Sequence, residues 1–123
     1  MPFTDQMIDT FYYGIQAPIH ANGFLCERID MDTFIGDILA KLKNEIESAS
    51  AIVADLTMAN PNVYLEVGYA WGIGKPTILI VKEGEKLKFD VQGQKCLHYK
   101  NIKYLEEILT KEIKGLVEKG KIK

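Results

Sequence analysis

Apolar and polar positions alternate along this chain with the two periods of regular secondary structure. In some segments apolar residues recur every three or four positions, as on the buried face of a helix. Other segments are short unbroken apolar runs, which are typical of strands buried on both faces of a parallel sheet. The predicted elements are, in order, a helix at 5–21, a strand at 24–29, a helix at 34–48, a strand at 50–56, a helix at 61–74, a strand at 76–82, a loop at 84–94, a strand at 95–99 and a helix at 101–119.

This order of elements predicts an α/β protein, a flavodoxin- or Rossmann-like three-layer sandwich with a parallel sheet in the strand order 2-1-3-4-5. The first strand of that order is truncated or missing, because the chain opens with "MPFTDQ" and passes directly into a helix. Two explanations stay open: the start codon was assigned late, or another element fills the gap. The length of 123 residues predicts a single domain over 1–123.

Composition narrows the classes of partner. The net charge of −2 is too near neutral for electrostatic binding to a nucleic acid polymer or a membrane surface. No signal peptide and no apolar run long enough to span a bilayer is visible, so a cytoplasmic location is expected. Cys26 and Cys96 lack metal-ligand spacing and are expected to be reduced core residues. We expect neither a metal nor a cofactor.

The segment "NPNVYLEVGYAWGIGKP" contains an unusual carboxylate. Its helix has almost no polar side, yet Glu66 lies in the middle, on one face with Val63 and Val67. In an open α/β sheet such a helix begins at the carboxyl end of the preceding strand, where ligands bind. Glu66 is therefore predicted to face a crevice at that end. The structural alternative is that it binds backbone amides or a tyrosine, or pairs with Arg28.

Further polar and aromatic residues are predicted to reach the same rim. Asp55 ends a strand and is the second candidate acid. The candidate substrate-binding residues are Phe3, Arg28, Asp30, Asp32, Thr57, Asn60 and Asn62. A loop at a helix N-terminus suits an anion such as phosphate, although asparagine there is equally typical of plain capping. Phe3 is suited either to stacking on a base or to the core, and Arg28 either to an anion or to a pair with Asp30.

Several segments resemble one family over nearly the whole chain. They are "GFLCERID", "FDVQG" and, most densely, "IVADLTMANPNVYLEVGYAWGIGKPTILI". These segments are similar to the nucleoside 2-deoxyribosyltransferase-like superfamily, and more closely to its uncharacterised bacterial and archaeal branch, which is also described as similar to TIR domains. The resemblance implies a nucleoside or nucleotide small molecule as the partner.

The resemblance also implies a reaction. The glutamate of the family's "E-x-G-x-A" motif is its nucleophile, and Glu66 matches this position. Such a carboxylate attacks the anomeric carbon, so that an N-glycosidic bond is cleaved or a deoxyribosyl group is transferred. The transferases place an aspartate six residues earlier, where this chain has Asn60, so Asp55 is the substitute acid. The alternative function is a catalytically silent, TIR-like module that senses nucleotides or binds partners.

Helix 61–74 also predicts assembly. Leu65, Gly68, Tyr69 and Gly72 lie roughly opposite its sheet-facing stripe, where a lone domain would carry charges. A helix that is apolar all round is buried on both sides, and a two-fold pairing of this helix with its copy is the simplest closed arrangement. We therefore expect a homo-oligomer. The alternative is that helix 101–119 or the loop at 83–94 of the same chain covers this surface.

Overall fold

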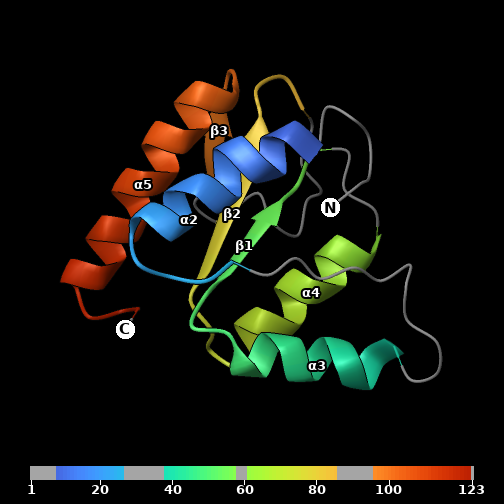
Figure 1. Cartoon of the computed structure of the whole chain (residues 1–123). Helices are drawn as coiled ribbons and strands as arrows, with labels where there is room; N and C mark the ends of the chain where they lie inside the picture. The colour runs from blue at the N-terminus through green and yellow to red at the C-terminus, as the bar shows by residue number, and fades with distance from the viewer. Residues whose placement is uncertain (1–7, 27–37, 58–60, 86–95, 123) are drawn as a thin grey trace.

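A computed structural model describes residues 8–26, 38–57, 61–85 and 96–122 of the chain. These residues form an α/β fold in which a parallel sheet lies between two layers of helices (Figure 1). The prediction of an α/β protein with a parallel sheet is confirmed. Among the described residues, no helix has the length and apolar character needed to cross a bilayer.

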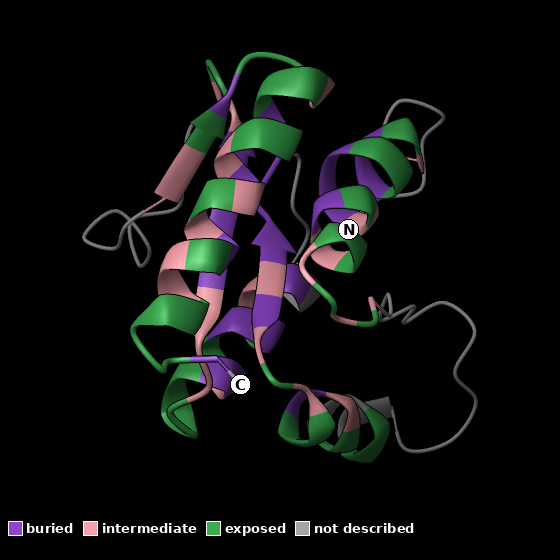
Figure 2. Ribbon diagram, turned by 60° about the vertical axis from the view of Figure 1, so that its left-hand side comes forward, coloured by how far each residue is buried: buried purple, intermediate pink, exposed green. Residues whose placement is uncertain are grey.

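The sheet consists of β1 (Ile52–Asp55), β2 (Thr77–Lys82) and β3 (Cys96–Tyr99), in that spatial order. Both neighbouring pairs are parallel, so the carboxyl ends of the three strands meet at one edge. The middle strand, β2, is buried on both faces, which explains its unbroken apolar sequence (Figure 2). Each fully buried aliphatic side chain there contributes about 1.5–3 kcal/mol of transfer free energy.

One helical layer is built from η1 (Thr10–Gln16), α2 (Ala17–Ala21) and α5 (Ile102–Glu118). The first two form one continuous helix with a widened π segment, in which the Ala17 N–H donates to the Tyr12 carbonyl oxygen five residues back. This helix packs tightly on α5, since a β-carbon on Gly14 would lie 2.6 Å from Leu105 Cδ2. The buried residues between this layer and the sheet are Phe11, Ile15, Ile78, Ile80, Tyr99, Leu105, Leu109 and Ile113.

The opposite face of the sheet is covered by α4 (Pro61–Gly72), and α3 (Ile38–Ser48) lies against α4. Two side chains join these helices. The Tyr69 hydroxyl donates to the Glu47 carboxylate, and Lys75 Nζ donates to the Glu47 and Ala49 carbonyl oxygens at 3.0 and 2.6 Å. Lys75 thus satisfies carbonyl groups at the C-terminal end of α3, where a cation is favourable.

Most predicted elements are observed with shifted ends. The predicted strand at 24–29 is the exception: Phe24–Cys26 form no strand, and residues 27–29 lie outside the described residues. A strand exists only where a neighbour accepts and donates its backbone hydrogen bonds. In the order 2-1-3-4-5 the neighbour of this segment would be the first strand, and no described residue takes that place. Leu25 is accordingly 92% exposed.

Candidate functional site

A buried polar network lies at the carboxyl edge of the sheet. Asp55 ends β1, Thr57 follows it by two residues, and Tyr99 ends β3. All three side chains are buried. Residues far apart in sequence meet here because parallel strands bring their carboxyl ends to one edge.

The network is a chain of hydrogen bonds that converges on the Asp55 carboxylate. The Lys82 N–H donates to Thr57 Oγ1 at 2.8 Å, and the Thr57 and Tyr99 hydroxyl oxygens lie 3.2 Å apart. The Tyr99 hydroxyl donates to Asp55 Oδ2 at 2.9 Å, which leaves the Thr57 hydroxyl to donate to Tyr99. The Thr57 N–H donates to Asp55 Oδ1, also at 2.9 Å. Both oxygens of Asp55 therefore accept a hydrogen bond.

Two opposing effects act on the acidity of Asp55. Burial raises the pKa of its carboxyl group above the ordinary value, because a charge loses its hydration. The hydrogen bonds from Thr57 and Tyr99 stabilise the ionised form and offset part of that rise. Burial and the nearby Asp55 charge also raise the pKa of the Tyr99 hydroxyl, so Tyr99 keeps the proton that it donates. Asp55 is thus held in position as an acceptor.

Glu66 has a different environment. It lies on α4, is 9% exposed, and its carboxylate makes no hydrogen bond with residues 8–26, 38–57, 61–85 or 96–122. Burial raises its pKa from 4.5 to about 7. Glu66 is therefore a carboxyl group that gains and loses a proton near neutral pH. A buried carboxyl group with this property is typical of acid–base and nucleophilic sites.

Asp55 and Glu66 line the same cavity, which has a volume of about 510 Å³. The cavity follows β1 from Ala51 to Asp55 and reaches η1, α2 and residues 23–26 on one side and Val63 of α4 on the other. Its lining residues are mainly apolar, and Asp55 lies at the end nearest the carboxyl edge of the sheet. Its volume lies within the range of about 300–1,000 Å³ that is typical of small-molecule sites.

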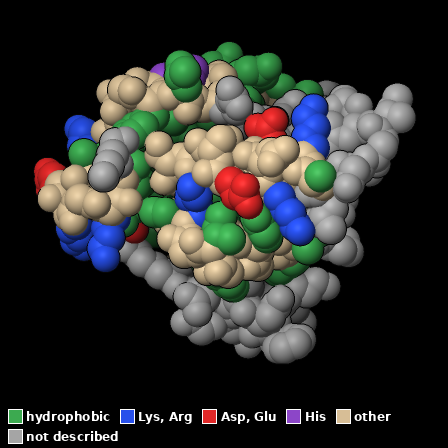
Figure 3. All heavy atoms as spheres, turned by 90° about the horizontal axis from the view of Figure 1, so that it is seen from below, with side chains coloured by type: hydrophobic (Ala, Val, Ile, Leu, Met, Phe, Trp, Pro, Cys, Tyr) green, Lys and Arg blue, Asp and Glu red, His purple; other side chains and the backbone are tan. Residues whose placement is uncertain are grey.

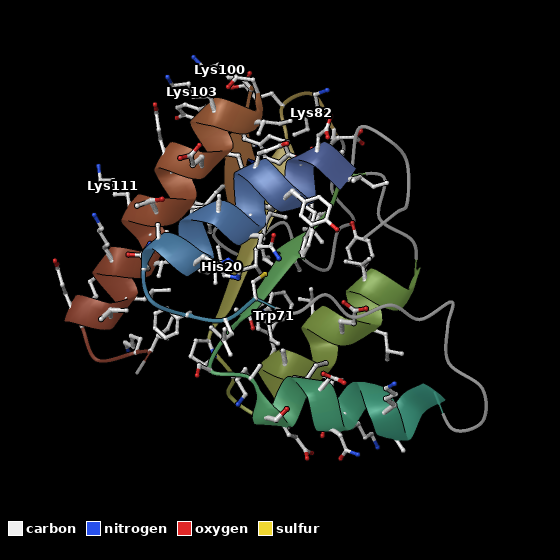
Figure 4. The ribbon with its side chains drawn as sticks, viewed as in Figure 1. His20, Trp71, Lys82, Lys100, Lys103 and Lys111 are labelled. Atoms are coloured by element: carbon white, nitrogen blue, oxygen red, sulfur yellow. The ribbon has the colours of Figure 1, made fainter. Side chains whose placement is uncertain are left out.

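Basic side chains gather outside this cavity. Lys82, Lys100 and Lys103 lie at the end of the molecule where the strands terminate, and their side chains point outward (Figure 4). No lysine, arginine or histidine is found among the described residues that line the cavity. Seen from below, basic and acidic side chains are intermixed, with no large patch of a single sign (Figure 3).

We compared the sequence with protein-family models and with curated proteins. No protein-family model matches it, and no curated protein matches it in sequence.

The structure describes only some of the predicted site residues. It brings Asp55 and Glu66 to one cavity and places Thr57 beside Asp55. The Thr57 hydroxyl is already engaged by Lys82 and Tyr99, so it supports Asp55. Phe3, Arg28, Asp30, Asp32 and Asn60 lie outside the described residues, as does the side chain of Asn62.

Tyr99 is the site residue that sequence reasoning missed. Its position in the sequence could have identified it. The predicted strand "KCLHY" ends in this tyrosine, and the carboxyl end of a parallel strand lies at the same edge of the sheet as Asp55. Cys96 begins the same strand, and burial raises the pKa of its thiol to about 11, so it remains protonated. No group of three or more His, Cys, Asp or Glu side chains suited to a metal occurs in the described parts of the chain.

Proposed function

We propose that this protein cleaves, or transfers the sugar of, the N-glycosidic bond of a nucleoside or nucleotide, with Glu66 as the nucleophile. The observation that carries the proposal is the pairing of two buried carboxylates in one cavity, one anchored by hydrogen bonds and one with none from the described residues. An oxocarbenium-like transition state carries positive charge, which carboxylates that line the cavity stabilise. The resemblance of "NPNVYLEVGYA" to the deoxyribosyltransferase-like superfamily points to the same reaction.

In the proposed reaction the ionised Glu66 carboxylate attacks the anomeric carbon. The bond from that carbon to the base nitrogen breaks, and its electron pair leaves with the base, which takes up a proton. The resulting glycosyl ester is then attacked by water or by a second base, and Glu66 is released as a carboxylate. Apolar walls such as Val63 and Phe11 keep bulk water from the ester and provide surface for the base.

Asp55 is proposed as the second carboxylate of the site. Its position is set by Thr57 and Tyr99, so its charge is directed into the cavity without reorganisation. The same hydrogen bonds favour the alternative function, a catalytically silent module that binds nucleotides. Because both Asp55 oxygens are already engaged, Asp55 is poorly placed to hand a proton to the departing base.

We propose that the described strands take the places of strands 3, 4 and 5 in a flavodoxin-like order whose first strand is truncated or missing. The order β1-β2-β3, all parallel, is the order of strands 3, 4 and 5 in the arrangement 2-1-3-4-5. The carboxyl end of the strand that follows the topological switch point is the usual ligand site of such sheets, and Asp55 lies at this position.

We also propose that two copies pair through α4. Leu65 is 47% exposed, and Gly68, Trp71 and Gly72 are exposed beside it. The predicted contribution of Tyr69 to this surface is weakened, because Tyr69 is half-buried and bonded to Glu47 of α3. The remaining strip is apolar with two glycines that permit close approach of a second helix.

The test is incubation with a panel of nucleosides, deoxynucleoside monophosphates and NAD, with chromatographic detection of free base. The expected result is base release by the parent protein and at least about a 1,000-fold loss in Glu66→Gln, which has nearly the same shape and no nucleophile. Glu106→Gln, on the exposed side of α5, is the matched control and should keep the parent rate. Binding of a panel member with no release of base would instead establish the silent module.

A further inference from the structure

The cavity has a second property that the proposed reaction does not use: one of its walls is an edge of β1 with which no described strand pairs. Five consecutive residues, Ala51 to Asp55, line it. Among the described residues, β1 has a single neighbour, β2. The other edge of β1 therefore faces the cavity.

The backbone groups on that edge can be identified. The N–H groups of Ile52 and Leu56 donate to the Pro76 and Ile80 carbonyl oxygens, each at 2.8 Å. Because N–H and C=O groups alternate in direction along a strand, those of Val53 and Asp55 point away from β2. They have no hydrogen-bond partner in the described part of the chain. Unpaired backbone groups beside an apolar cavity are unfavourable unless they are completed by a partner.

The sequence of β1 is that of a strand with neighbours on both sides. Natural edge strands are protected by lysine, proline or a bulge, which prevent pairing with another chain. "AIVAD" contains none of these and is buried or half-buried throughout. Helices rise on both sides of the edge, with Phe11 and Ile15 of η1 on one side and Val63 of α4 on the other. A single extended segment fits between them, whereas the edge of a second folded sheet, with its own helices, would collide with these walls.

The charged side chains of the cavity further restrict which extended segment can bind there. The charged side chains among the described lining residues are all acidic: Asp55 at the carboxyl end of β1, Glu66 on α4, and Glu45 in the last turns of α3, which leads to the amino end of β1. A complementary segment has an apolar centre and a cation at each end. About four residues, at about 3.3 Å each, match the length of β1.

We propose that this groove is an acceptor site for a β-strand: it binds an extended peptide segment of another polypeptide, with about four apolar residues flanked by lysine or arginine, which pairs with the free edge of β1. This is recognition by strand addition, in which main-chain hydrogen bonds supply affinity and the groove walls supply specificity. The inference goes beyond the proposed reaction and does not depend on it.

The probe is a blocked synthetic peptide, Lys-Val-Ile-Val-Val-Lys, added to the full-length, isotope-labelled protein. The first measurement is amide hydrogen exchange, read residue by residue. At ten times the dissociation constant, exchange of the Val53 and Asp55 amides should slow by about tenfold. The amides of Ile52 and Ala54 already belong to the ladder with β2 and serve as internal controls. Binding that leaves Val53 and Asp55 unprotected, or no binding at millimolar peptide, would overturn the proposal.

Two further peptides separate strand pairing from simple hydrophobic adhesion. Both carry two N-methyl groups in the apolar centre, on alternate residues in one and on adjacent residues in the other. Alternate methylation blocks one edge of the strand and leaves the other able to pair, whereas adjacent methylation blocks both. The first should bind like the parent peptide and the second at least about tenfold more weakly. Equal affinities would refute pairing with β1. Exchange of both lysines for glutamate should also weaken binding, because Glu45, Asp55 and Glu66 then repel the ends.

Discussion

The hydroxyl of Tyr99 donates a hydrogen bond to Asp55 Oδ2 at 2.9 Å, across a separation of 44 residues in the sequence. This contact links the outer strands of the described sheet at their carboxyl ends, with β2 between them. The Thr57 N–H donates to Oδ1, so the two contacts together engage both oxygens of Asp55. The position of the Asp55 carboxylate therefore depends on the assembly of the sheet.

Tyr99→Phe is expected to destabilise the protein by about 1–3 kcal/mol, because it leaves the buried Asp55 and Thr57 oxygens without their partner. The loss of this donor should also raise the pKa of Asp55 further. Chemical denaturation measures the first effect. Tyr104→Phe on the surface of α5 is the control and should change stability by less than about 0.5 kcal/mol. Equal effects of the two substitutions would contradict the importance of the network.

The stability of the folded protein should fall as the pH rises from 4.5 to about 7. The folded state raises the pKa of Glu66 from 4.5 to about 7, so the folded protein binds this proton more tightly than the unfolded chain does. The stabilising contribution of protonated Glu66 is present below pH 4.5 and is lost by about pH 7. Its size is on the order of 2 kcal/mol after allowance for solvent screening. Glu66→Gln, which cannot ionise, should be the more stable protein at pH 8, as urea denaturation at a series of pH values will test. A parent and variant with parallel pH profiles would argue against a buried carboxyl group.

The proposed reaction has its own pH dependence, with the opposite sign. Attack on the anomeric carbon requires the ionised form of Glu66, so kcat/KM for base release should drop about tenfold per pH unit below the pKa of about 7 and level off above it. The measurement is initial-rate base release between pH 5.5 and 8.5. A rate that is independent of pH in this range would exclude Glu66 as the nucleophile.

The proposed pairing of two copies through α4 can be tested by placing a charged side chain on this surface. Leu65→Glu should convert an oligomer to a monomer of 13.9 kDa, because a carboxylate cannot be buried between two apolar helices without a partner. Tyr104→Glu places the same charge on α5, in the opposite helical layer, and should leave the oligomer intact. Light scattering at micromolar concentration reads the mass directly. If the parent is already a monomer at every concentration, α4 is not an interface.

Because η1 packs closely on α5, the addition of one methyl group at Gly14 should lower the stability of the protein. Gly14→Ala would place a β-carbon 2.6 Å from Leu105 Cδ2, whose side chain is fully buried, and should destabilise by about 1–3 kcal/mol. Gly115→Ala is the matched control, since nothing lies within 4 Å of its β-carbon and alanine favours a helix by about 1 kcal/mol. Thermal unfolding should move in opposite directions for the two variants.

Hydrophobic periodicity predicted the sheet and its helices because it reports burial directly. The strand at 76–82 was recognisable since both its faces are covered, and the helix at 101–119 since one face is. The segment at 24–29 has a similar apolar pattern and was predicted as a strand. Periodicity describes side chains, whereas a strand also needs a neighbouring strand to pair with, and Phe24–Cys26 pair with none of the described strands.

The candidate site was predictable only where one residue conflicted with its surroundings. Glu66 stood out as a carboxylate in an apolar helix, and Asp55 as an acid at the end of a buried strand. Tyr99 did not stand out, because a tyrosine at a strand end is compatible with ordinary packing. Its role depends on the side-by-side arrangement of the three strands, which local sequence does not encode.

The link between Asp55 and Tyr99 also has a consequence for the order of folding. During synthesis β1 and β2 emerge before β3. The Asp55 carboxylate therefore gains its hydrogen bond from the Tyr99 hydroxyl only when β3 docks. A half-formed sheet of two strands would hold a desolvated acid without that donor, and such an intermediate is unfavourable. Assembly of the sheet should therefore be cooperative, because the buried carboxylate is stable only once all three strands are in place. A refolding chain acquires its polar edge only when its last strand arrives.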